Sequence, residues 1–463
     1  MRSKYFTVTV LLLFSISFVN EMQAQIKIDT QTKLGVVKPV NGYQNGPVFC
    51  SGSAIEVDNS SEFKQANFPY IRLHDVNYPM QPQEVDIDVI FKDFDADADD
   101  PANYDFRATD EYINSIEAVG AKVIYRLGTT KIFDHYPSHP PKDFSKWAKI
   151  CLNVARHYNE GWANGYHKNI LYWEVWNEPE MKTRWTGTPQ QFYELYATVA
   201  RLFKKEMPHV KIGGYGASDV RGNFFKGFLL YVQENDLPLD FFSWHRYDTS
   251  VDMFRRLAIS VRELLDLHGF TETESILDEW AYFSNNWGLF KDPTGGRKRW
   301  ELFLESQSMI AASFIAAMLI EMLNMPIDIA TYYQCTPGLW WSPFNTFGVP
   351  EKIFYPFVAF NQTINGGERA LAECTVPGIY TLAVTTGAEL RIMLANYKGK
   401  TGAYNLDVMG LDKKARYKST LHILDEQRDF EIIEERAGLS HADILRSVYL
   451  QENTVAMITI SVM

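Results

Sequence analysis

Residues 171–215 contain one complete strand–helix–strand unit. The unit begins with the apolar run LYWEVW at residues 171–176 and ends with the run KIGGY at residues 211–215. Between the two runs, apolar side chains recur with helical spacing, at Phe192, Leu195, Tyr196, Val199 and Phe203. Two short apolar runs joined by a long amphipathic segment predict parallel strands, because parallel strands need a crossover connection.

The same alternation extends in both directions from this unit. Runs with strand character lie at residues 34–40, 70–74, 122–127, 171–176, 211–215, 241–245, 275–280 and 328–333. Eight such units over roughly 300 residues predict a closed (β/α)8 TIM barrel rather than an open sheet. We assign residues 25–365 to this barrel. The strongly apolar segment 309–323 is too short to span a bilayer and is expected to be a barrel helix.

The alternation of strand-like and helical segments ends at about residue 366. Short runs rich in β-branched residues follow at 390–394, 421–424 and 456–462, and turn residues separate them. In the last run, apolar and other side chains alternate, as in a strand with one buried face. The sequence therefore predicts a C-terminal antiparallel β-sandwich over residues 366–463. Residues 25–33 precede the first barrel strand and are a candidate additional strand of this sandwich.

The N-terminus has the pattern of a signal peptide. Arg2 and Lys4 form a positive start, an apolar run covers residues 6–19, and Ala24 is a small residue suited to cleavage. The apolar run is shorter than a transmembrane helix. We therefore expect residues 1–24 to be removed, the protein to be secreted or periplasmic, and the mature chain to have no membrane span.

The net charge and the spacing of the cysteines limit which partners and cofactors we expect. The chain has a formal net charge of −12, which disfavours binding to a phosphate backbone, so nucleic acid is not an expected partner. The four cysteines are distant in sequence and form no zinc-binding pattern. Alternating aspartates at 93–99 lack the glycine and glutamate of a calcium-binding loop and indicate a hydrated surface loop. We expect neither a metal nor another cofactor.

Two glutamates end predicted strands of the barrel. The fourth strand leads into Asn177-Glu178-Pro179, and the seventh leads into Glu279. Functional groups of TIM barrels gather at the C-terminal ends of the strands. Two carboxylates at one barrel rim are the groups that glycosidic bond cleavage requires. One protonates the leaving oxygen, and the other stabilises the positive charge that develops on the sugar. Glu178 is the predicted general acid/base and Glu279 the predicted nucleophile.

Neighbouring carboxylates offer alternatives to both residues. Glu174 would share a face with Glu178 in a regular strand, but Pro179 marks the strand end, so Glu174 is expected deeper in the barrel or on its helix side. Asp278 competes with Glu279, and strand alternation predicts that Asp278 faces the opposite side. Asn177, beside Glu178, is a candidate hydrogen-bond partner for a sugar hydroxyl.

Several motifs occur in the order seen in one enzyme family. They are Tyr70-Ile71-Arg72-Leu73-His74, Asp143-Phe144-Ser145-Lys146-Trp147, Asn177-Glu178-Pro179, Ile212-Gly213-Gly214, His245-Arg246-Tyr247, Glu279-Trp280 and a run from Phe347-Gly348 to Phe357. From about residue 33 to residue 360, the chain resembles glycoside hydrolase family 39 of clan A, the family of β-xylosidases and α-L-iduronidases. The resemblance implies a retaining glycosidase with a carbohydrate substrate.

The resemblance also implies roles for residues around the two glutamates. Arg72 would hydrogen-bond the nucleophile and keep it ionised. His74 and His245 would contact the sugar in the cleaved subsite, and Tyr247 would lie near Glu279. Trp340 or Trp341, after the last barrel strand, would form a stacking wall.

The substrate stays open at this stage. Asp75 and the loop at residues 334–345 depart from the family pattern near the sugar site. A β-D-xyloside is the first expectation, followed by another pentopyranoside, an exopolysaccharide fragment or an iduronide. A non-catalytic carbohydrate-binding relative is an alternative, although the chain keeps both carboxylates. A metal-dependent barrel hydrolase is a weaker one, because the early strands lack paired histidines. The sequence does not decide exo or endo action, or the oligomeric state.

Overall fold

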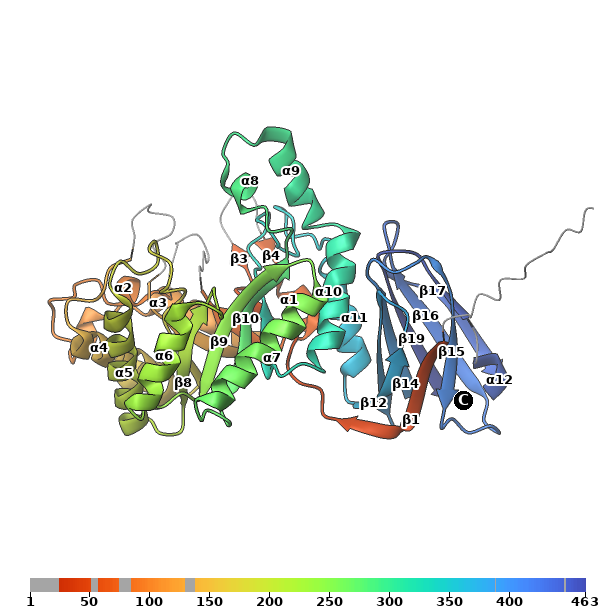
Figure 1. Ribbon diagram of the computed structural model, residues 1–463, viewed down its shortest axis with the longest axis horizontal. Coiled ribbons are helices and arrows are strands. Elements are labelled where there is room, and N and C mark those ends of the chain that lie inside the picture. The colour runs from red at the N-terminus through yellow and green to blue at the C-terminus, as the bar shows by residue number, and fades with distance from the viewer. Residues whose placement is uncertain (1–24, 51–56, 75–84, 130–137, 388, 445–446) are drawn as a thin grey trace, which may run out of the picture.

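The computed structural model describes residues 25–50, 57–74, 85–129, 138–387, 389–444 and 447–463. The predicted signal peptide and Asp75 lie outside the described residues. The chain forms a barrel and a separate β-sheet domain, joined side by side (Figure 1). The predicted fold class is therefore confirmed.

Eight parallel strands close the barrel, and each pairs with its neighbours in chain order. The strands are β2 (Gly42–Gln44), β5 (Tyr70–Leu73), β6 (Lys122–Leu127), β7 (Tyr172–Val175), β8 (Lys211–Ala217), β9 (Phe241–Asp248), β10 (Glu274–Tyr282) and β11 (Ile329–Tyr332). The larger helices are α3 (Arg107–Ala118), α4 (Phe144–Glu160), α5 (Pro189–Glu206), α6 (Asn223–Glu234), α7 (Val251–Leu267), α10 (Met309–Met322) and α11 (Tyr355–Ile364). A capping box between Thr188 and Gln191 starts α5.

The prediction that the first barrel strand covers residues 34–40 is wrong. Strand β1 ends at Gly35, and the barrel strand β2 follows at Gly42–Gln44. Strand β2 has three residues, of which Tyr43 alone has a large apolar side chain, so hydropathy does not reveal it. Gly42 fits because a Cβ atom there would lie 2.8 Å from the Ala330 carbonyl oxygen of the neighbouring strand.

The second domain is a nine-stranded sheet. Its order is β17-β16-β19-β14-β13-β12-β1-β15-β18. The strands are β1 (Gln25–Gly35), β12 (Glu368–Cys374), β13 (Ile379–Thr386), β14 (Glu389–Asn396), β15 (Gly402–Met409), β16 (Tyr417–Leu424), β17 (Asp429–Leu439), β18 (Ser447–Leu450) and β19 (Thr454–Val462). Side chains from both ends of this order share one core. The sandwich is therefore one continuous sheet folded over a common interior.

Strand β1 belongs to this sheet although it is the first described element of the chain. It runs antiparallel to β12 and parallel to β15, with Ile26 and Ile28 buried in the shared core. The remaining neighbours in the sheet are antiparallel.

Helix α10 is apolar on all sides because it lies between the two domains (Figure 1). It contacts α7 and β10 of the barrel and also β13, β14 and β19 of the sheet. Within the described ranges, the helical stretch Gly296–Met322 is long and apolar enough to cross a membrane by length and composition. In its most apolar window, 67% is buried inside the structure, and the contacts of α10 with both domains account for that burial.

A helical excursion follows β10. Helices α8 (Trp287–Lys291) and α9 (Gly296–Glu305) rise beyond the end of that strand (Figure 1). The short β3–β4 hairpin (Phe49–Cys50 and Val57–Asp58) lies near them in the view. The excursion therefore stands at the barrel face formed by the C-terminal strand ends.

Candidate active site

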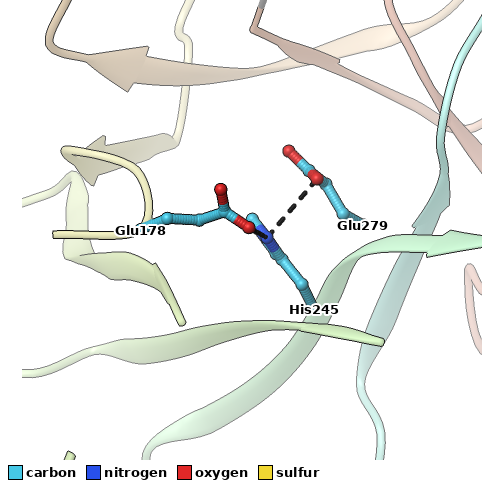
Figure 2. A group of neighbouring side chains, drawn as sticks. All are labelled: Glu178, His245 and Glu279. Carbon is cyan, nitrogen blue, oxygen red and sulfur yellow. Dashed lines mark hydrogen bonds and ion pairs between the residues drawn. The ribbon is translucent and has the colours of Figure 1, made fainter. Parts of the chain in front are cut away.

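Three side chains meet at the C-terminal ends of the barrel strands. Figure 2 shows Glu178, from the loop after β7, pointing toward Glu279 of β10, with His245 of β9 between them. His245 Nδ1 lies 3.0 Å from Glu178 Oε1 and 3.4 Å from Glu279 Oε2. A carboxylate oxygen of Glu178 and one of Glu279 lie within 4.8 Å of each other. The two predicted catalytic carboxylates therefore share one small site.

The backbone turns sharply to present Glu178. Strand β7 ends at Val175, and Trp176 and Glu178 have φ angles of 73° and 51°. Left-handed backbone is uncommon in residues other than glycine and is often found at functional sites. The Glu178 amide donates to the carbonyl oxygens of Tyr215 and Gly216 at 3.2 and 3.1 Å. These bonds hold the turn, so Glu178 does not simply continue the alternation from Glu174.

Arg72 lies at the centre of the barrel mouth, fully buried. Its guanidinium donates to Glu174 Oε2 at 2.7 Å, to Gln44 Oε1 and Glu279 Oε1 at 2.9 Å, and to Asn177 Oδ1 at 2.8 Å. Burial acts to lower the pKa of Arg72, but Asp278, Glu174 and Glu279 outweigh it and raise that pKa well above its usual range. Arg72 is therefore a permanent cation that binds the predicted nucleophile.

The predicted orientation of Asp278 is wrong. Its Oδ2 lies 2.8 Å from Arg72 Nε, inside the barrel. The register of β10 against β9 shifts between Leu277 and Glu279, which indicates a bulge. A bulge breaks the alternation of side chains, so Asp278 and Glu279 both face inward.

Glu174 takes the deeper of its two predicted positions. It is fully buried and accepts a hydrogen bond from Ser243 Oγ as well as from Arg72. Burial acts to raise the pKa of Glu174, but Arg72 and a hydrogen bond with Asp278 lower it overall. Burial and the charges of Glu174 and Glu279 raise the pKa of Asp278 well above its usual range, against the effect of Arg72. Asp278 is therefore the more readily protonated carboxyl of this pair.

Both oxygens of Glu279 accept hydrogen bonds. Arg72 donates to Oε1, and the Tyr247 hydroxyl donates to Oε2 at 2.9 Å. Burial, with the nearby charge of Glu279, raises the pKa of Tyr247, so its hydroxyl remains a donor. His74 is buried, with Nε2 3.8 Å from Glu279 Oε1. Burial and the cations Arg126 and Arg72 hold the pKa of His74 well below its usual range, so its imidazole is neutral.

His245 governs the charge of Glu178 in this arrangement. Burial acts to raise the pKa of Glu178. The hydrogen bond and electrostatic interaction with His245, together with Arg184 and Arg72, outweigh burial and lower that pKa. Redirection of the His245 hydrogen bond would therefore favour the protonated form of Glu178.

The two tryptophans predicted as a stacking wall differ in exposure. Trp341 is buried, donates from Nε1 to the Tyr282 carbonyl oxygen at 3.0 Å, and packs against the Tyr247 ring at 5.2 Å. Trp340 is half-buried and contacts Phe290 at 4.8 Å. Trp341 thus supports Tyr247 from behind, and Trp340 lies toward the α8–α9 excursion.

Gly216 and Glu180 also shape the site, although the sequence analysis did not select them. A Cβ atom on Gly216 would lie 2.9 Å from Asn177 Oδ1 and 3.0 Å from His245 Nε2, so the site leaves no room for a side chain there. Glu180 Oε1 accepts from the Ser218 amide and hydroxyl and from the Asp219 amide, at 2.5, 3.0 and 3.0 Å. Proximity to Glu178 within Glu178-Pro179-Glu180 was the available sequence signal for Glu180.

Glu178, His245 and Glu279 are also spaced closely enough to hold a metal ion, and they form the only such group among the described residues. The Glu279 oxygens, however, already accept from Arg72 and Tyr247. A guanidinium in contact with Glu279 competes with a cation for the same carboxylate. The arrangement therefore fits carboxylate chemistry better than metal chemistry.

The chain is similar to known glycoside hydrolases in sequence and in fold. Residues 58–266 match the model for "Glycosyl hydrolases family 39". A Beta-xylosidase from Caldicellulosiruptor saccharolyticus is 25% identical over 371 residues, which cover 72% of this chain and 70% of that protein. A glucosidase structure from Croceicoccus marinus has a TM-score of 0.78 at 23% identity, with 95% and 99% of the two chains covered. A monomeric beta-xylosidase structure from Caulobacter crescentus CB15 has a TM-score of 0.71 at 17% identity, with 95% and 99% covered.

The buried carboxyl of Glu180 gives a pH-dependent contribution to stability. Burial raises its pKa to about 7, with a smaller contribution from the charge of Glu178. A carboxyl with a raised pKa in the folded state stabilises the protein most at low pH, and this stability is lost as pH rises toward the folded pKa. We expect Glu180→Gln to gain stability relative to the wild type as pH rises from about 4.5 to about 7.

Unfolding monitored by denaturant titration at several pH values measures this difference. Glutamine keeps the Oε1 acceptor for Ser218 and Asp219, so the loop should remain intact. Glu194→Gln, at an exposed position on α5, is the control and should show no such trend. A stability difference between Glu180→Gln and the wild type that does not change with pH would contradict the assignment.

Proposed function

Because this chain belongs to glycoside hydrolase family 39, we propose that it hydrolyses O-glycosidic bonds with retention of anomeric configuration. Glu279 is the proposed nucleophile and Glu178 the proposed general acid/base. The proposal concerns the mechanism and the substrate.

The separation of the two carboxylates carries the mechanistic proposal. A carboxylate oxygen of Glu178 and one of Glu279 lie within 4.8 Å of each other, which is on the short side of the two known arrangements. Retaining enzymes hold the pair about 5–5.5 Å apart, whereas inverting enzymes leave about 6.5–9.5 Å to admit a water molecule. The short distance supports direct attack of Glu279 on the anomeric carbon.

In the first step, a Glu279 oxygen forms a bond to the anomeric carbon as the bond to the leaving oxygen breaks. Arg72 and Tyr247 orient Glu279 through their hydrogen bonds. Glu178 delivers its proton to the leaving oxygen. A turn of His245 from Glu178 toward a sugar hydroxyl would assist this step, because its hydrogen bond favours the ionised form of Glu178.

In the second step, water hydrolyses the glycosyl ester. Glu279 is neutral while it is esterified, and Glu178 is now a carboxylate that takes a proton from the attacking water. The ester bond breaks, and Glu279 leaves as a carboxylate. Two inversions at the anomeric carbon give overall retention.

A β-D-xyloside is the proposed substrate class. The chain is similar to a curated Beta-xylosidase over most of its length. His74 and His245 lie close to Glu279, and Asn177 shares the Arg72 guanidinium with it. These three residues are the proposed contacts for sugar hydroxyls. The Asn177 amide nitrogen is buried and has no hydrogen-bond partner among the described residues, which leaves it available to a hydroxyl.

Export of the protein is also part of the proposal. The basic start, the short apolar run and Ala24 favour cleavage of residues 1–24. Expression in an export-competent bacterial host should give a protein outside the cytoplasm that begins at Gln25. N-terminal sequencing checks this expectation, and an uncleaved cytoplasmic chain would contradict it.

The first-formed sugar anomer tests the mechanism directly. We expect hydrolysis of a 4-nitrophenyl β-glycoside to release the β-anomer first, because Glu279 and water each invert the anomeric carbon once. Proton NMR during the first minutes, before mutarotation, distinguishes the anomers. An α-anomer as first product would remove the covalent step and the role of Glu279.

Substitution of each glutamate tests its role. Glu178→Ala should lower kcat by about 100- to 10,000-fold, the usual contribution of general acid–base catalysis. Glu279→Ala should lose at least as much, and added azide should restore turnover with an inverted glycosyl azide product, because the small anion fills the vacated space. Glu194→Ala is the control carboxylate and should keep wild-type activity. Wild-type turnover by Glu279→Ala without azide would exclude it as nucleophile.

A further inference from the structure

Helix α9 carries an exposed tryptophan on the excursion beside the barrel mouth. Trp300 is 55% exposed and stacks on Phe303, with ring centroids 5.1 Å apart and an interplanar angle of 17°. One face of the indole is thus supported by Phe303, and much of the ring faces solvent. Tryptophan is enriched at binding interfaces, because its large apolar ring also carries an N–H donor.

A continuous series of ring contacts joins Trp300 to the candidate active site. Phe303 contacts Trp340 at 5.3 Å, Trp340 contacts Trp341 at 5.9 Å, and Trp341 contacts Tyr247 at 5.2 Å. Tyr247 in turn donates a hydrogen bond to Glu279. The exposed ring therefore belongs to the aromatic wall that backs the proposed nucleophile, at the end of that wall away from it.

We infer that Trp300 and Phe303 form a second carbohydrate subsite, which holds a sugar residue of the substrate chain other than the one that Glu279 attacks. The inference rests on the proposed glycosidase function. It makes a sugar chain, rather than a simple glycoside, the preferred substrate.

The surroundings of Trp300 fit a sugar ring. A pyranose offers flat C–H faces for stacking on an aromatic ring and hydroxyl groups around its edge. Arg297 and Glu301, on the same helix turn as Trp300, form an exposed ion pair at 2.8 Å and provide hydrogen-bond donors and acceptors. The core of a protein–protein interface is instead depleted of charged residues. A flat ring with charged groups at its border therefore favours a sugar over a second copy of this chain.

Chain-length dependence tests the subsite. A panel of 4-nitrophenyl glycosides, beginning with the β-D-xyloside, identifies the sugar that the wild type hydrolyses. Oligomers of that sugar with two to six residues, beginning with β-1,4-linked xylose, are then compared by kcat/KM. We expect Trp300→Ala to lower kcat/KM for the longer oligomers by about 3- to 10-fold, the effect of one aromatic contact. The aryl glycoside should change less than about twofold, because it does not reach Trp300.

Two control variants separate stacking from other effects. Trp300→Phe keeps an aromatic face and should recover most of the activity on long oligomers. Leu267→Ala removes another exposed apolar side chain, at the end of α7, and should match the wild type on all substrates. Calorimetric titration of the hexamer into Glu279→Ala, with and without Trp300→Ala, measures the same contact without turnover and should show a similar loss of affinity.

The outcomes distinguish this inference from the proposed function. A wild type that hydrolyses neither an aryl glycoside nor an oligomer contradicts the proposed function, while the binding measurement still tests the subsite. Normal aryl glycoside activity with no chain-length effect of Trp300→Ala overturns the subsite alone. An equal loss on every substrate would show a structural role for Trp300 and also overturn it. A change in oligomeric mass by light scattering without a chain-length effect would instead identify an interface between copies.

Discussion

The guanidinium of Arg72 connects parts of the barrel that are distant in sequence. It contacts Gln44 of β2, Glu174 of β7, Asp278 and Glu279 of β10, and Asn177 in the loop after β7. A buried cation is costly unless it is paired and hydrogen-bonded, and buried carboxylates are equally costly without a cation. Each side of this cluster therefore requires the other, and the strand ends that carry them must meet in one register.

The charges around Arg72 influence the two proposed catalytic carboxylates, Glu279 and Glu178. The pKa of Asp278 is raised while that of Glu174 is lowered, so Asp278 is the carboxyl of this pair that is more readily neutralised. Glu279 is the member that reaches the open side of the cluster, where Tyr247 and His245 also contact it. His245 then links Glu279 to Glu178 across the barrel mouth. Glu178 and Glu279 thus lie at the outer end of a buried network, and hydrogen bonds fix the geometry of that network.

Sequence reasoning recovered the barrel because most strands are apolar runs between amphipathic helices. It failed at β2, whose three residues pair in the barrel mainly through the backbone and carry little hydropathic signal. The predicted orientation of Asp278 was also wrong. The bulge in β10 arises from its pairing with β9, and the order of apolar and polar residues in β10 does not reveal it. Glu178 and Glu279 could be selected by their positions at strand ends, and Arg72 by the resemblance to the family. The contributions of Gln44 and Gly216 arise only from contacts between strands that are far apart along the chain.

The position of β1 between β12 and β15 has a consequence for how the molecule is made. During synthesis β1 leaves the ribosome first, but β12 begins only at Glu368. At roughly 5–20 residues per second, the first strand waits on the order of 15 to 70 seconds for its partner. The barrel can form in that interval, whereas the sheet cannot be completed until nearly the whole chain exists. Strand β1 therefore pairs only with strands that are made much later, and the C-terminal sheet domain cannot be excised as an independent module without also taking β1.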